Sequence, residues 1–234
     1  MAAHAGDPPA DLARRVALRA TETRQVRDEY TYRQTVTVEE LSPNGGKAGE
    51  YREVREVTFS PGKERTETVA GRTVETLQRL RLTEEDFRDI REVQPFLFEA
   101  DKLWSYETRY KGEENIDGVD CYILLVRPRQ ILAGQRLFDG LLWVTKDDYS
   151  IVRTEGKAVP EIRSTKNENL FPRFTTIWQP VDGKFRFPVY TVGDDTLDFR
   201  VGPQRIRLTI RYSNYKRFGS ESTVKFGEPV EPKR

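Results

Sequence analysis

The sequence predicts a mainly β protein (α+β): an unclosed, strongly curved antiparallel β-barrel with two or three helices covering its concave face. Two observations predict this class. From Tyr30 to Tyr215, roughly ten strand-like segments follow one another without the regular interleaving of helices that marks a parallel sheet. The segments 119–126 and 138–145 are apolar on both faces, which indicates strands that are covered on two sides.

The first element expected is a helix at 11–28. Leu12, Val16, Ala20 and Thr23 fall along one side of it, and charged residues occupy the rest. A carboxylate at Asp11 is suited to capping its free backbone N–H groups. The pattern therefore predicts a helix that lies with one face on an apolar surface.

A strand at 30–38, a hairpin loop at Ser42–Gly49 and a returning strand at 50–60 are expected next, followed by a weaker, charged pair of segments. A second helix is expected at 83–93. Thr83 is a suitable N-cap and Asp86 follows three residues later, a pattern close to a capping box.

The rest of the chain is expected to be strands and turns. We predict hairpin turns at Lys146–Asp148, Val181–Lys184 and Val192–Asp195. The strands at 119–126 and 138–145 are placed in mid-sheet, with a helix or loop over one face and other protein over the second. Among their apolar residues, we expect nearly complete burial of Leu124, Leu142 and Val144. Leu208 is expected to be similarly buried if the apolar face of its strand meets the helices.

The whole chain has 234 residues and shows no composition break and no internal repeat. We expect a disordered lead at 1–10, a single domain at 11–226 and a tail at 227–234. Its 39 basic and 38 acidic residues argue against a dedicated nucleic-acid binder. No apolar run approaches the roughly 20 residues of a membrane helix.

The residues of the common catalytic and metal sites are scarce. His4 is the only histidine, which excludes histidine-dependent triads and the usual zinc sites; no cofactor and no metal is expected. Cys121 lies in an apolar run and is interpreted as a buried small hydrophobe. The carboxylate pairs Asp147–Asp148 and Asp194–Asp195 fall in predicted turns, where Asp favours the backbone conformation.

Several aromatic residues lie on predicted strands, among them Trp104, Trp143 and Trp178. They have two interpretations: a close-packed core, or the walls of an apolar cavity between the sheet and the helices. In the second, the helix at 83–93 is a lid whose apolar residues rest on a ligand, and tryptophans of the sheet report occupancy. The candidate cavity residues are Phe87, Ile90, Phe96, Phe98, Trp104, Leu142, Trp143, Phe174, Trp178 and Leu208.

About half of the chain resembles the bacterial outer-membrane lipoprotein-sorting proteins, relatives of the LolA/LolB lipoprotein carriers. The residues that carry the resemblance are "YETRYKGEENIDGVDCYILLVRPR", "LFDGLLWVTKDDYSIVRTEGK", "FPRFTTIWQPVDGKFRFPVY" and "IRYSNYKRF". The resemblance implies an unclosed β-barrel with helices on its concave side. It also implies a periplasmic location after removal of a signal peptide, and a cavity for acyl chains.

The resulting hypothesis is a non-enzymatic periplasmic binder or carrier whose ligand is a lipid or a lipoprotein acyl chain. An alternative is a protein-interaction or envelope-stress sensor module on the same fold, with an envelope protein as its partner. A third is a carboxylate-dependent hydrolase. The start of the sequence also allows a cytoplasmic location.

Overall fold

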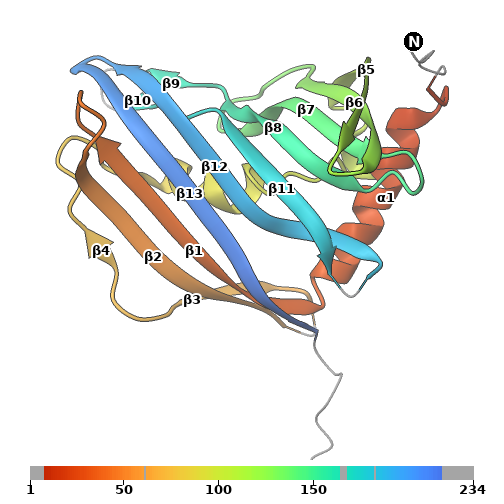
Figure 1. The fold of residues 1–234 in the computed structure, drawn as a ribbon, viewed down its shortest axis with the longest axis horizontal. Coiled ribbons are helices and arrows are strands. Elements are labelled where there is room, and N and C mark those ends of the chain that lie inside the picture. The colour runs from red at the N-terminus through yellow and green to blue at the C-terminus, as the bar shows by residue number, and fades with distance from the viewer. Residues whose placement is uncertain (1–7, 61, 164–167, 182, 218–234) are drawn as a thin grey trace, which may run out of the picture.

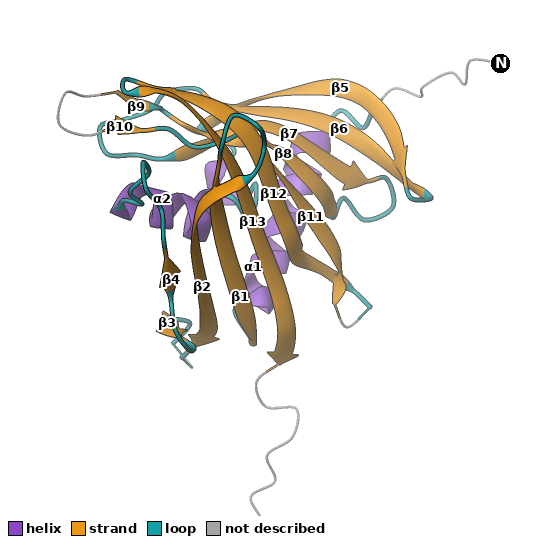
Figure 2. Ribbon diagram, turned by 60° about the vertical axis from the view of Figure 1, so that its left-hand side comes forward, coloured by secondary structure: helices purple, strands orange, loops and turns teal. Residues whose placement is uncertain are grey.

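The computed structural model describes residues 8–60, 62–163, 168–181 and 183–217. Within them, one antiparallel sheet of eleven strands dominates, and its path is not closed. The sheet curls around helices that lie on one side of it (Figures 1 and 2). The predicted fold class is confirmed. Of the expected lead at 1–10, only residues 8–10 are described, and the expected tail at 227–234 lies outside the described residues.

The strands of the large sheet follow a fixed spatial order. From one edge to the other they are β3 (Arg65–Val69), β2 (Lys47–Phe59), β1 (Tyr30–Leu41), β13 (Gly202–Arg217), β12 (Phe185–Phe199), β11 (Phe174–Val181), β8 (Ile151–Val159), β7 (Leu137–Thr145), β6 (Val119–Pro128) and β5 (Tyr106–Ile116). The short β4 (Val74–Glu75) pairs with β2, while β9 (Ile162–Arg163) and β10 (Glu168–Asn169) form a separate pair.

Helix α1 (Leu12–Arg27) confirms the first predicted helix. Its buried side holds the predicted residues and, in addition, Ala17 and Arg27. The expected cap is wrong, because Asp11 makes no side-chain capping bond and its carboxylate accepts from Arg15 at 2.7 Å instead.

The second predicted helix is split in two. It begins as α2 (Glu84–Arg88) and continues as a π-helical turn, η1 (Asp89–Val93). The capping box is confirmed: the Thr83 hydroxyl accepts from the Asp86 N–H, and the Asp86 carboxylate accepts from the Thr83 N–H at 2.7 Å. A 3-10 turn, η2 (Ala100–Lys102), follows. The chain from α2 to η2, residues 84–102, lies on the concave face and is named here the covering segment.

One predicted turn is wrong. Val192–Asp195 lies inside β12, and the chain reverses after Phe199 instead. Asp194 and Asp195, read from the sequence as turn residues, stand opposite Arg207 and Ile206 of β13. Asp194 there accepts hydrogen bonds from Arg205 at 2.9 Å and Arg207 at 3.2 Å, so cross-strand ion pairs account for this carboxylate. Asp195 instead accepts from the backbone N–H groups of Arg173 and Thr196.

The strands predicted in mid-sheet are interior but close to one edge, since β6 pairs with the edge strand β5 and β7 follows it. Leu124, Leu142 and Val144 are at most 3% exposed, as predicted. On the second face, Trp143 packs with Cys121 and Val152, which belong to the neighbouring strands. There the guanidinium of Arg153 lies 3.7 Å from the ring centroid, so a long side chain of the next strand shields it.

Two glycines let an aromatic ring lie flat on the sheet. Gly140 and Gly156 are paired across β7 and β8. A Cβ at either position would come within 2.7 Å of the Phe138 ring. That ring stacks on Phe96 with centroids 4.6 Å apart, so the paired glycines allow the cover to pack closely on the sheet.

We expect Leu142→Ala to lower the free energy of unfolding by about 2–5 kcal/mol, because it removes buried methyl groups and leaves a cavity. Leu132, which is 56% exposed, provides the matched control: Leu132→Ala is expected to change that free energy by less than about 0.5 kcal/mol. Urea unfolding followed by circular dichroism measures both variants. Equal effects of the two substitutions would contradict the packing described for β7.

Candidate functional site

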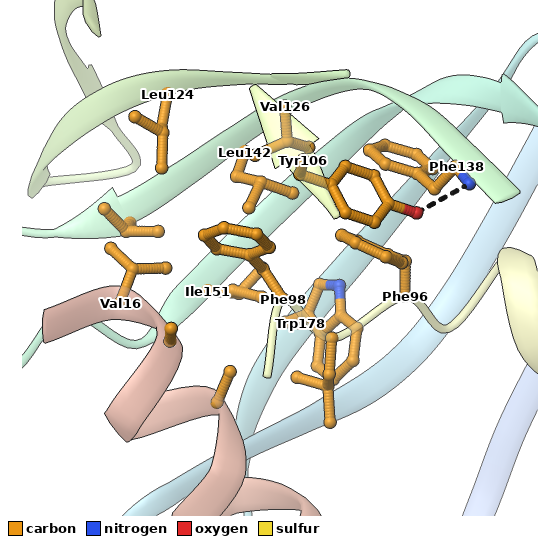
Figure 3. Close-up of a cluster of buried hydrophobic side chains, with 14 of the residues drawn as sticks. Val16, Phe96, Phe98, Tyr106, Leu124, Val126, Phe138, Leu142, Ile151 and Trp178 are labelled. Atoms are coloured by element: carbon orange, nitrogen blue, oxygen red, sulfur yellow. Dashed lines mark hydrogen bonds between the residues drawn. The ribbon is translucent and has the colours of Figure 1, made fainter. Parts of the chain in front are cut away.

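The centre of the concave face is filled by side chains. Val16 of α1 and Phe98 of the covering segment point toward Leu142 and Ile151 of the sheet, with Trp178 beside them (Figure 3). The Tyr106 hydroxyl accepts a hydrogen bond from the Phe138 N–H at 3.3 Å. These side chains are at most 4% exposed, so the cluster is a close-packed core.

The ten candidate cavity residues therefore separate into groups. Those in the central cluster are Phe96, Phe98, Leu142, Phe174 and Trp178. Ile90 and Leu208 belong to a second cluster on the β1, β2 and β13 side, and the half-buried Phe87 packs against it. The helix at 83–93 thus lies over that second cluster.

Two of the candidate tryptophans lie elsewhere. Trp143 packs with Cys121 and Val152 in a small cluster apart from the two larger ones. Trp104 precedes β5 instead of lying on a strand as expected, and it is 89% exposed. Neither residue lines the cavities described below.

Next to the second cluster lies a cavity of about 380 Å³, named here the apolar cavity. Its floor is formed by β1 and β13, and its walls by the segment before α2 and the chain after β10. The apolar residues that line it are Val38, Leu80, Leu82, Leu170, Phe171, Pro172, Phe199, Val201, Ile206 and Leu208. Leu208 is the one candidate residue among them.

A buried carboxylate holds one wall of the apolar cavity in place. Glu40 is 1% exposed, and it accepts hydrogen bonds from the backbone N–H groups of Gln78 at 2.8 Å, Arg79 at 2.7 Å and Leu80. Gly49 permits the close approach of this wall, because a Cβ there would lie 2.5 Å from the Thr76 carbonyl oxygen. The backbone N–H groups of this wall are thus bound to Glu40, while its leucine side chains remain available to a ligand.

The buried polar side chains around the apolar cavity already have partners. Asn169 donates to the Asp86 carboxylate at 2.7 Å, and Gln204 donates to the Leu41 carbonyl at 3.0 Å. Burial raises the pKa of Asp86 to about 6, while hydrogen bonds from Thr83 and Asn169 oppose that rise. Arg79 and Glu168, which also line the cavity, have backbone partners, and Arg81 is exposed at its edge. Apart from these charged groups, the surface left free for a ligand is hydrocarbon.

A second cavity, of about 800 Å³, lies where the end of α1 meets β3 and the covering segment, and is named here the arginine-lined cavity. Its cationic residues are Arg24, Arg27, Arg65, Arg91, Lys102 and Arg136. Apolar residues of the covering segment and β7 also line it, Phe96 among them, as do the carboxylates of Glu67, Glu92, Glu99 and Asp101. No pattern in the sequence predicts this cavity, because its cationic residues come from α1, β3, the covering segment and the residue before β7.

The other carboxylate pair considered from the sequence is confirmed in its predicted turn. Asp148 accepts from the Thr145 hydroxyl at 2.6 Å and from the Ser150 hydroxyl at 2.8 Å. These hydrogen bonds, with the Arg19 charge, hold the pKa of Asp148 below its usual value in spite of burial. Among the described residues, no cluster of His, Cys, Asp and Glu is suited to holding a metal ion.

No protein-family model and no curated protein matches the chain. Similar solved structures exist. A DUF1329 family protein from Desulfovibrio piger is 16% identical, with a TM-score of 0.44 over 95% of this chain and 98% of that one. A LolA superfamily protein from Nitrosomonas europaea is 14% identical, with a TM-score of 0.36 over 86% and 94%.

An outer membrane lipoprotein-sorting protein domain from Vibrio parahaemolyticus is 12% identical, with a TM-score of 0.39 over 90% of this chain and 95% of that one. Two of these three structures carry the name of the group that the sequence resembles. At TM-scores below 0.5 the likeness says nothing about a ligand or a partner.

The raised pKa of Asp86 predicts a pH dependence of stability. Because the folded-state pKa of about 6 exceeds the usual 3.8, the folded protein binds this proton more tightly than the unfolded chain. The stabilisation is present below pH 4 and is lost as the pH rises to about 6. We expect the unfolding free energy of Asp86→Asn, relative to the unsubstituted protein, to increase over that window by up to about 3 kcal/mol.

Urea unfolding of both proteins at several pH values measures this difference, in which the titration of other groups largely cancels. A difference that stays constant between pH 4 and 7 would show that Asp86 titrates near its ordinary pKa.

Proposed function

We propose that this protein binds the hydrocarbon chain of a lipid, or of a lipid-modified protein, in the apolar cavity. The observation that carries the proposal is the lining: ten apolar side chains border about 380 Å³ of space, although Arg79, Arg81 and Glu168 border it as well. Ligand pockets for small molecules begin at about 300 Å³. The driving force is the removal of apolar surface from water, at roughly 25 cal/mol per Å².

The satisfied polar groups favour a chain over a polar metabolite. A polar ligand needs unpaired donors or acceptors to fix its orientation. Here Asn169 donates to Asp86, Asp86 also accepts from the Thr83 N–H, and Gln204 donates to a backbone carbonyl. A polar ligand would therefore gain little from these side chains. A hydrocarbon chain requires no such partner and is the chemistry that matches this surface.

The cavity has an exposed hydrophobic residue at its edge. Val201, in the turn between β12 and β13, lines the cavity and is 78% exposed. The Arg79 guanidinium donates to the Val201 carbonyl at 3.3 Å, which ties this turn to the wall held by Glu40. We assign the entry of the chain to this turn.

The proposal assigns no catalytic step to the protein and places it in the periplasm, the location that the sequence resemblance implies. In the described part of the chain, no helix has the length and hydropathy needed to cross a membrane. The proposed role is therefore that of a carrier or receptor for a hydrophobic ligand.

We expect a neutral single-chain amphiphile, such as a monoacylglycerol below its aggregation limit, to bind saturably with micromolar affinity, about -8 kcal/mol. Leu82→Trp should weaken that binding at least about tenfold, because the indole occupies the space of the chain. Isothermal titration calorimetry is the measurement. Tryptophan quenching is unsuitable, because no tryptophan lines the apolar cavity.

The matched control is Leu132→Trp, which adds the same side chain at an exposed position outside both cavities. It should leave the affinity unchanged. Equal affinities of the two variants, or no saturable binding to the unsubstituted protein, would refute the proposal. Organic extraction of the purified protein followed by mass spectrometry identifies any lipid that copurifies.

One observation favours the alternative of a protein-interaction module. Trp104 is 89% exposed and lies directly before β5, an edge strand of the sheet. An exposed aromatic residue beside an unpaired strand edge is typical of sites where a partner adds a strand. If the neutral amphiphile does not bind, the protein-interaction module becomes the better supported of the two functions.

A further inference from the structure

The arginine-lined cavity contains a buried cation without a partner. Arg27, in the last turn of α1, is 5% exposed and lines the cavity. Among the described residues, neither a carboxylate nor any other hydrogen-bond acceptor pairs with its guanidinium. Burial lowers the pKa of Arg27 and the nearby Arg24 acts in the same direction, while Tyr32, Tyr215 and the Asp28 carboxylate oppose that change. An arginine nevertheless stays charged in a protein, so the position holds a positive charge that no hydrogen bond or ion pair within the described residues neutralises.

The other cations of this cavity differ from Arg27. Each has a nearby carboxylate: Arg24 donates to Asp28 at 3.1 Å, Arg65 to Glu67 at 2.7 Å, and Lys102 to Glu99 at 2.6 Å, while Arg136 is paired with Asp89 and Arg91 lies 3.9 Å from Glu92. The free charge is therefore specific to Arg27. A buried charge without a partner is unfavourable in the empty protein, which indicates a position that a ligand completes.

A second donor beside Arg27 is also unsatisfied. The Nη2 atom of Arg65 is buried without a hydrogen-bond partner, although Nη1 donates to the Tyr32 hydroxyl at 2.9 Å. Tyr215 lies within electrostatic reach of both Arg27 and Arg65, which brings the two guanidinium groups into one neighbourhood. Burial raises the pKa of Tyr215 well above its ordinary value, so its phenol does not supply the missing negative charge at neutral pH.

We infer that the arginine-lined cavity binds an oxyanion, of the phosphate or carboxylate type, on the guanidinium of Arg27. A planar guanidinium offers parallel N–H donors that match two oxygens of such a group. Association would neutralise the charge that the fold leaves buried, and this provides the free energy for selecting an anion over a neutral group.

The apolar residues that line the same cavity indicate that an amphiphile is the source of the oxyanion. Val93, Pro95, Phe96, Leu97 and Leu137 line the same space as Arg27. A ligand that carries hydrocarbon next to its anionic group would contact both Arg27 and these apolar residues, whereas a free anion would contact only Arg27. The inference concerns a cavity other than the apolar cavity, and it does not depend on the proposed function.

The test compares a lysophosphatidate with a monoacylglycerol of the same chain, both below their aggregation limits, and with inorganic phosphate. The ratio of the two amphiphile affinities isolates the contribution of the phosphate, wherever the chain lies. We expect the lysophosphatidate to bind at least about tenfold more tightly than the monoacylglycerol, and Arg27→Met to abolish that preference. Isothermal titration calorimetry gives the affinities.

Two further variants separate a binding role from a structural one. Arg14→Met removes an exposed arginine from the same helix and should leave the preference intact. Arg27→Lys keeps the charge but loses the paired donors, and should retain an intermediate preference. Because Arg27 has no partner, the melting temperature of Arg27→Met should equal or exceed that of the unsubstituted protein.

Inorganic phosphate distinguishes the sources of the oxyanion. Tight binding of phosphate alone that depends on Arg27 would support the site and identify a free anion as its ligand. The same dissociation constants for Arg27→Met and the unsubstituted protein would overturn the inference, as would equal affinity for the charged and neutral amphiphiles. Either result leaves the Leu82→Trp test of the apolar cavity unaffected.

Discussion

The buried ion pair between Arg136 and Asp89 is the interaction on which the concave side of the molecule depends. It joins η1 of the covering segment to the residue that precedes β7. Arg136 also donates hydrogen bonds to the Asn169 side chain at 2.9 Å and to the Pro160 carbonyl. Asn169 in turn donates a hydrogen bond to the Asp86 carboxylate. Removing one partner would leave an uncompensated buried charge, which is strongly destabilising.

This network also forms the partition between the two cavities. Arg136 lines the arginine-lined cavity, whereas Asp86 and Asn169 line the apolar cavity. A curved sheet encloses more space than one helix and a covering segment can fill. The aromatic residues fill the centre around Phe138 and Trp178, so the unfilled space remains at the two ends of the cover.

Two buried charges illustrate how structural and binding roles differ. Glu40 is surrounded by backbone N–H groups that satisfy its carboxylate, so its role is to position the wall before α2. Arg27 is equally buried but has no acceptor within the described residues, so its charge is available to something that enters. The presence or absence of partners, more than burial itself, indicates which buried charge serves recognition.

The sequence by itself determined the elements whose signals are local. Periodicity located α1 and most strands, Thr83 and Asp86 predicted the capping box, and the lost alternation predicted a buried Leu142. Only the tertiary structure decided where the apolar cavity lies. Leu82, Phe171 and Leu208 are far apart in the sequence, and the strand order and the path of the chain before α2 bring them to one cavity. Tertiary pairing also decided the conformation of Val192–Asp195, because the pairing with β13 keeps these residues in a strand in spite of their turn-like composition. Arg27 lacks a partner because the nearby carboxylates form ion pairs with the other cations of the cavity, which the sequence does not show.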